Sequence, residues 1–187
     1  MTLIKSISGI RGTIGGKPNQ GLTPIDTVKF VSAYGTWVIN QNPNKKISVI
    51  IGRDARISGT MISNIVSGTL MGLGIDVIDL ELSTTPTVEM AVCDLNAQGG
   101  IILTASHNPK QWNALKLLNA SGEFISEAIG LEILGLAESE NFNYAEVQNL
   151  GKYIINSDYL LTHLNKIINL PYVDCEAIKK ANFTVVI

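Results

Sequence analysis

Apolar positions along the chain fall into two alternating patterns, short continuous runs and longer runs with helical spacing. The short runs are rich in β-branched residues and have the length of strands; they cover residues 3–7, 47–52, 75–82, 99–105 and 114–118. Strands that alternate with helices predict an α/β fold with three layers, α/β/α. A tight turn at 106–109 joins the last two runs and adds an antiparallel hairpin, so we expect a mixed β-sheet.

Helix start signals precede several of the longer runs. In the segment 22–40, Thr23 can cap the helix, Pro24 suits its first position and Asp26 lies in the first turn. Ser58 is a suitable cap for a helix that ends near Leu73. The face of the first helix that we expect to be buried contains Ile25, Val28, Val31 and Val38.

Three further helices are expected after the third strand-type run. The segment 84–96 again begins with a threonine followed by proline, and the spacing of its apolar residues makes it one-sided: Val88, Ala91, Val92 and Leu95. Segments 126–138 and 157–170 are also helical in pattern, the second ended by Pro171. The chain then ends within an apolar β-type run, a poor place for a domain to stop. We therefore expect one domain over 1–155, and over 156–187 a helical linker with the first strand of a truncated second domain.

Composition and charge narrow the class of protein. The 187 residues are 45% hydrophobic and 16% charged, with a mean hydropathy of +0.24, which is typical of a folded globular protein. A formal net charge of -2 gives no basic surface for nucleic acid. No apolar run approaches the roughly 20 residues of a membrane span. The cysteines Cys93 and Cys175 form no CxxC motif, which fits a reducing compartment, and we expect a cytoplasmic protein.

Ser106 is the first candidate for chemistry, in the stretch "TASHNP" at the end of a strand-type run. Strand ends are where α/β proteins place ligands and reactive groups. The surrounding residues do not form the G-x-S-x-G nucleophile elbow of hydrolases, and adjacency alone does not place the imidazole of His107 on the serine hydroxyl. A nucleophile, a phosphate carrier and a plain turn formed with Asn108 and Pro109 all remain open.

Two cations could join this serine. Lys116 follows it by ten residues, and a hairpin would return the amine to its side, although a lysine that simply lies at a sheet edge is the common alternative. Arg11 lies in "SGIRGTIGG", which we expect to be a glycine-rich loop where backbone N–H groups and a guanidinium could approach an anion. A flexible loop without a ligand is the alternative there.

The remaining charged motifs are interpreted as structural. Arg53, Asp54 and Arg56 in "GRDAR" are expected to form a salt-bridged brace for a loop, without a catalytic role. Asp54, Asp76 and Asp79 are not spaced as a metal site. By themselves, the residues therefore indicate a protein surface that binds phosphate and carries an exposed serine.

Four motifs in order, "SGIRGTIGG", "GRDARISG", "TASHNP" and the lysine of "QWNALKLL", resemble the α-D-phosphohexomutase family. These enzymes are the phosphoglucomutases, phosphomannomutases and phosphoglucosamine mutases, and the match covers the family's first domain over nearly the whole chain. The resemblance implies that Ser106 carries a phosphoryl group and exchanges it with a hexose phosphate through a hexose 1,6-bisphosphate. Sugar 1-phosphates and 6-phosphates are thereby interconverted.

The resemblance also implies roles for neighbouring residues. Arg11 and Lys116 would supply charge and proton transfer, and His107 would be part of the catalytic loop. Asn108, Gly12 and Thr13 would bind the substrate phosphate. A Mg²⁺ ion would be bridged to Ser106 through its phosphate, with its other ligands in a second domain.

Departures from the family pattern limit what this chain can do. The family has three further domains, which carry a metal loop, a sugar-recognition loop and a phosphate clamp, so we expect the remaining domains of a longer chain and a sugar phosphate as partners. Ala114 stands where the family commonly has glycine. The sugar stays open, and the alternative function is a module of the same fold that binds a sugar phosphate or a partner without turnover.

Overall fold

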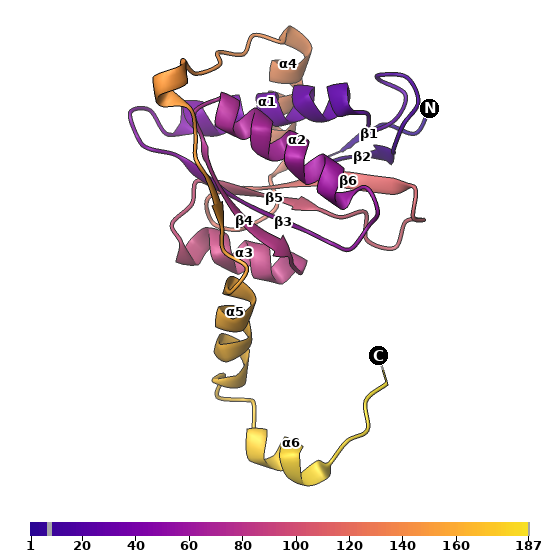
Figure 1. Cartoon of the computed structure of the whole chain (residues 1–187), viewed down its shortest axis with the longest axis vertical. Coiled ribbons are helices and arrows are strands. Elements are labelled where there is room, and N and C mark those ends of the chain that lie inside the picture. The colour runs from indigo at the N-terminus through magenta and orange to yellow at the C-terminus, as the bar shows by residue number, and fades with distance from the viewer. Residues whose placement is uncertain (7–8, 187) are drawn as a thin grey trace.

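The computed structural model describes residues 1–6 and 9–186, and a seven-stranded sheet runs through it (Figure 1). The strand order is β1-β2-β6-β5-β3-β4-β7. Strands β5, β3, β4 and β7 are parallel neighbours, whereas β1, β2, β6 and β5 are antiparallel neighbours, which confirms the predicted mixed sheet. The strands are β1 (Ile4–Ser6), β2 (Gly9–Thr13), β3 (Ser48–Arg53), β4 (Asp76–Leu82), β5 (Gly99–Leu103), β6 (Trp112–Leu118) and β7 (Tyr153–Ile155).

Helices cover both faces of the sheet and complete the predicted three layers (Figure 1). Helices α1 (Pro24–Gln41), α2 (Gly59–Gly72) and α4 (Glu127–Ser139) lie on one face, and α3 (Thr85–Asp94) lies on the other. A short 3-10 helix, Val147–Asn149, precedes β7. Helices α5 (Tyr159–Ile168) and α6 (Cys175–Ala181) follow β7 and extend away from the sheet. No helix of the described residues is both long and apolar enough to cross a membrane.

Helix α1 begins as predicted, but its buried face is rotated. The Thr23 backbone N–H donates to Asp26 Oδ2 (3.1 Å) in a capping box. Val31 is buried, whereas Ile25 is 64% exposed. The buried stripe instead holds Thr27, Phe30, Val31, Tyr34 and Val38. Ile25 lies six positions before Val31, about 120° around the helix, so the two cannot share one narrow face.

Two other helix predictions also need correction. Ser58 does precede α2, but it has helical backbone angles and its side chain makes no capping bond. Its hydroxyl oxygen accepts instead from Asn113 Nδ2 (2.9 Å). In α3 the predicted face is confirmed at Val88, Ala91 and Val92, which are buried, whereas Leu95 lies beyond the helix and is 36% exposed.

The predicted glycine-rich loop is largely a strand. Gly9–Thr13 forms β2, between β1 and β6. The sequence does not indicate this strand because glycine is uncommon within strands. Glycine is needed at residue 9, where a Cβ would lie 2.1 Å from the carbonyl oxygen of Leu115 and the backbone has φ +114°. Ile7 and Ser8, the end of the predicted first strand and the start of the predicted loop, lie outside the described residues.

The C-terminal region contains one strand that the pattern did not predict. β7 pairs in parallel with β4 at the edge of the sheet, between the two segments predicted as helices over 126–138 and 157–170. Residues 183–186, predicted as a strand, have no regular structure, and Ile187 lies outside the described residues. The domain boundary after residue 155 stays a prediction.

Candidate active site

A cavity of about 190 Å³ lies where β5 and β6 are joined. The antiparallel register sets Lys116 opposite Ile102, and Arg11 of β2 opposite Ala114. Because alternate residues of a strand share a face, Arg11, Ala114 and Lys116 lie on the same face of the sheet. The predicted hairpin is confirmed and brings Lys116 to the cavity beside the serine, while the pairing of β2 with β6 brings Arg11 there. The lining residues are Gly9, Arg11, Thr104, Ala105, Ser106, His107, Asn108, Ala114, Lys116 and Phe124.

Ser106 occupies the turn with an uncommon backbone conformation. Its φ is +53°, in the left-handed region that most residues with a side chain avoid. The backbone N–H of Ser106 donates to Thr104 Oγ1 (3.1 Å). Its exposed hydroxyl lies 3.5 Å from His107 Nδ1, at the outer limit of a hydrogen bond. The loop therefore presents the hydroxyl to the cavity and to solvent without a tight partner.

Lys116 has a neighbour that sequence reasoning missed. Its ammonium group lies 5.6 Å from the centre of the Phe124 ring, in a cation–π contact. Phe124 is 41% exposed and lines the cavity. The available signal was an aromatic residue within the otherwise polar stretch "SGEF".

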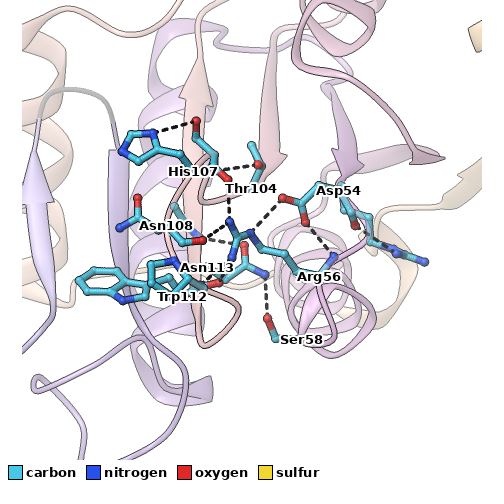
Figure 2. A network of polar contacts seen from close by, with 12 residues as sticks. Asp54, Arg56, Ser58, Thr104, His107, Asn108, Trp112 and Asn113 are labelled. Carbon is cyan, nitrogen blue, oxygen red and sulfur yellow. Dashed lines mark hydrogen bonds and ion pairs between the residues drawn. The ribbon is translucent and has the colours of Figure 1, made fainter. Parts of the chain in front are cut away.

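The loop is held from outside the cavity by Arg56, as Figure 2 shows. The guanidinium Nε lies 3.1 Å from Asp54 Oδ2, which confirms the predicted salt-bridged brace. What it braces was not predicted: the other guanidinium nitrogens donate to backbone carbonyls of residues 106–112. Arg53 makes one long contact from Nη1, to the Asp54 carbonyl (3.4 Å).

Gly12 and Thr13 lie on β2 but do not line the cavity. A Cβ at Gly12 would lie 2.8 Å from the backbone nitrogen of Leu22, so glycine there permits close packing. The Thr13 hydroxyl is 2.6 Å from that of Thr2. The described contacts of both residues are structural, and their binding of phosphate stays a prediction.

The described residues do not form a metal site by themselves. No group of three or more His, Cys, Asp or Glu side chains among them is arranged to hold a metal ion. The cavity lining contains His107 and no carboxylate.

Fold and cavity together define a class of protein, an α/β domain with a mixed sheet. Its cavity, at the end of an antiparallel hairpin, has two cationic side chains that can bind an anion. Residues 3–144 match the model of "Phosphoglucomutase/phosphomannomutase, alpha/beta/alpha domain I". The chain belongs to this family.

Individual relatives agree with the family match. A phosphoglucosamine/phosphogalactosamine mutase of Sulfurisphaera tokodaii is 35% identical over 96% of this chain and 37% of its own length. A phosphoglucomutase/phosphomannomutase of Thermococcus kodakarensis is 34% identical over 94% of this chain and 38% of its own. A crystal structure of a phosphoglucomutase/phosphomannomutase family protein from Burkholderia thailandensis, at 22% identity, supports the fold with a TM-score of 0.71 over 88% of this chain and 36% of that one. The chain thus spans little more than a third of the length of these relatives.

Proposed function

We propose that the protein interconverts the 1-phosphate and 6-phosphate of a hexose or hexosamine, with Ser106 as the phosphoryl carrier. One observation carries the proposal: the serine hydroxyl opens into a cavity that is also lined by Arg11 and Lys116. The names of the two relatives together support a hexose or hexosamine phosphate as the substrate. This chain supplies the phosphoserine part of the site.

The transfer begins from a phosphorylated Ser106. A sugar hydroxyl oxygen attacks the phosphorus and loses its proton, the bond from phosphorus to Ser106 Oγ breaks, and Oγ takes up a proton. The product is a hexose 1,6-bisphosphate, which returns its other phosphoryl group to Oγ by the reverse step. Phosphoryl transfer requires positioning and positive charge around the phosphate oxygens more than covalent help.

Arg11 and Lys116 supply that positive charge. The guanidinium of Arg11 can hold two phosphate oxygens at once, and the ammonium of Lys116 can neutralise a third and donate a proton to Oγ. The ammonium of Lys116 lies over the Phe124 ring, and both residues line the cavity. When bound, Mg²⁺ would neutralise further charge on the phosphate, and among the described residues the phosphoserine oxygens would be its ligands.

The test uses the purified full-length protein, meaning the longer chain that is expected to join residues 1–187 to the remaining domains. It is assayed with Mg²⁺ and the 1-phosphates of glucose, mannose and glucosamine. We expect wild type to convert at least one of them and to carry phosphate on the peptide that contains residue 106. Ser106→Ala removes the accepting oxygen and should abolish both conversion and labelling. Ser121→Ala, at an exposed serine outside the cavity, is the matched control and should keep both.

Two outcomes would contradict the proposal. Turnover that survives in Ser106→Ala would show that another group carries the phosphate. A wild-type protein that binds these sugar phosphates and converts none of them would favour the binding module.

A further inference from the structure

Arg56 lies outside the cavity, yet it contacts the loop that carries Ser106 at several points (Figure 2). We propose that Arg56 is a positioning residue, which holds the Ser106 loop in the conformation required for phosphoryl transfer. The inference rests on the proposed function, because it assigns a role in the same transfer.

The guanidinium of Arg56 donates hydrogen bonds to four backbone carbonyls, three in the connection between β5 and β6 and one at the start of β6. Nη2 donates to the carbonyl oxygens of Ser106 (2.7 Å) and Asn108 (2.8 Å). Nη1 donates to those of Pro109 (2.9 Å) and Trp112 (3.1 Å). These acceptors span the whole connection between β5 and β6, so a single side chain fixes its path.

The guanidinium is itself fixed from the end of β3. Its Nε donates to Asp54 Oδ2 (3.1 Å), and the backbone N–H of Arg56 donates to Asp54 Oδ1 (3.0 Å). The Asp54 backbone N–H donates to the Leu103 carbonyl (3.1 Å), which anchors the carboxylate next to β5. The Arg56 side chain is only 11% exposed.

All five N–H donors of Arg56 therefore have acceptors within the protein, one for Nε and two for each terminal nitrogen. No donor remains for a phosphate. This separates Arg56 from Arg11, whose exposed side chain lines the cavity. The geometry points to control of the loop and not to contact with a ligand.

The loop needs such control because of the backbone at Ser106. Its left-handed conformation is sparsely populated and persists only where the surroundings impose it. If the carbonyl groups of residues 106 and 108 moved, the nearly buried guanidinium of Arg56 would lose hydrogen bonds. Without the guanidinium, residue 106 can relax to a common conformation, which turns the hydroxyl away from Lys116.

Lysine cannot substitute for this arginine. An ammonium group has three donors on one nitrogen and no planar fork, so it cannot reach four carbonyls that approach from different directions. A role that needed only positive charge would tolerate lysine. The Arg56→Lys variant therefore separates geometry from charge.

A second contact allows Arg56 variants to fold. Asn113 Nδ2 donates to Ser58 Oγ (2.9 Å), which joins the same two segments independently of Arg56. The pairing of β5 with β6 also remains. We expect the loop to loosen while the sheet stays intact.

The experiment compares Arg56→Lys and Arg56→Met in the full-length protein with Arg53→Lys and Arg53→Met as controls. The rate of phosphoryl transfer from glucose 1,6-bisphosphate to Ser106 and the kcat and KM for turnover are measured. Both Arg56 variants should lose about 100-fold in transfer rate and kcat, the scale of a misplacement near 1 Å, with KM nearly unchanged. The Arg53 variants should match wild type.

Hydrogen exchange provides a readout that does not depend on catalysis. The Arg56 variants should exchange faster over residues 104–112, while β3 and β4 exchange as in wild type. Uniform acceleration across the sheet, or no change in the loop, would overturn the inference. So would wild-type transfer in Arg56→Lys, or a rise in KM at unchanged kcat.

Failure of the proposed function has a different signature. In that case wild type itself transfers no phosphoryl group to Ser106, and the positioning role in transfer falls with it. If wild type transfers and Arg56→Lys transfers equally fast, only the inference about Arg56 is overturned.

Discussion

Gly9 and Ser106 both border the cavity, and both have backbone angles that side chains seldom allow. Gly9 has φ +114° and meets the Leu115 carbonyl so closely that no Cβ fits. Ser106 adopts φ +53° although it has a side chain. The glycine lets β2 approach β6, which brings Arg11 to the cavity; the serine forms the turn and exposes its hydroxyl to the cavity.

Gly9→Ala should destabilise the protein by about 3 kcal/mol, because the new methyl group clashes with the backbone of β6 and the positive φ is strained. Gly15→Ala is the matched control. It also has a positive φ (+98°), but nothing lies within 4 Å of its Cβ position, so about 1 kcal/mol is expected. Denaturant unfolding measures both, and equal losses would show that the contact with Leu115 is unimportant.

Polar side chains join helix α5 to α3, where Tyr159 is also packed in an apolar cluster with Val88 and Ala91. Asp94 at the end of α3 accepts from Lys166 Nζ (2.5 Å) and from the Tyr159 hydroxyl. His163 Nδ1 lies 2.9 Å from Thr87 Oγ1. The Lys166 ammonium, followed by the Tyr159 hydroxyl, holds the pKa of Asp94 below its ordinary value. Burial, followed by Asp94, raises the pKa of Tyr159, so the phenol stays a donor.

The docking of α5 should consequently depend on pH at the acid end. A carboxyl group whose pKa is lowered by folding stabilises the protein above its unfolded pKa, near 4, and this stability is lost as pH falls through the folded pKa. Asp94→Asn should remove that contribution. The difference in unfolding free energy between wild type and variant should be largest above pH 4 and should shrink as pH decreases toward 2.

Asp158→Asn is the control for this experiment. Asp158 precedes α5 but its side chain makes no capping bond, so the variant should keep the wild-type pH profile. If the difference in unfolding free energy between wild type and Asp94→Asn does not change with pH, the role given to Asp94 is contradicted.

For the protein as a whole, the size of the cavity limits what this chain can do by itself. Its volume of about 190 Å³ is below the roughly 300–1,000 Å³ of typical ligand pockets. A phosphoryl group on Ser106 would fit within it, whereas an entire hexose bisphosphate would not. The relatives are more than twice as long, so their remaining sequence can supply the sugar contacts.

Residues 1–187 alone are therefore expected to show no turnover of glucose 1-phosphate, while the full-length protein does. Coupled detection of glucose 6-phosphate checks this, with Ser106→Ala of the short chain as the background. Turnover by the short chain above that background would show that the site is complete without further sequence.

Local patterns predicted the hairpin and the approach of Lys116 to Ser106, because both depend on a short turn. They also identified Arg56 as a brace, but not its target, since the carbonyls it contacts are distant in sequence and backbone acceptors have no sequence signal. β2 was interpreted as a loop because glycines usually break strands, whereas here they serve close packing, Gly9 against β6 and Gly12 against Leu22. β7 is short and exposed on both sides, so no alternation indicated it.

The pairing of β2 with β6 also bears on how the protein is made. Ile10 pairs with Leu115, so the ribosome completes β1 and β2 long before their neighbour in the sheet exists. Two paired strands are marginally stable in water without a third. During synthesis Arg11 therefore stays exposed to water, without Lys116 beside it, until the residues after the Ser106 turn have emerged from the ribosome. The cavity can assemble only after β6 has emerged, although its first residue is among the earliest to be translated.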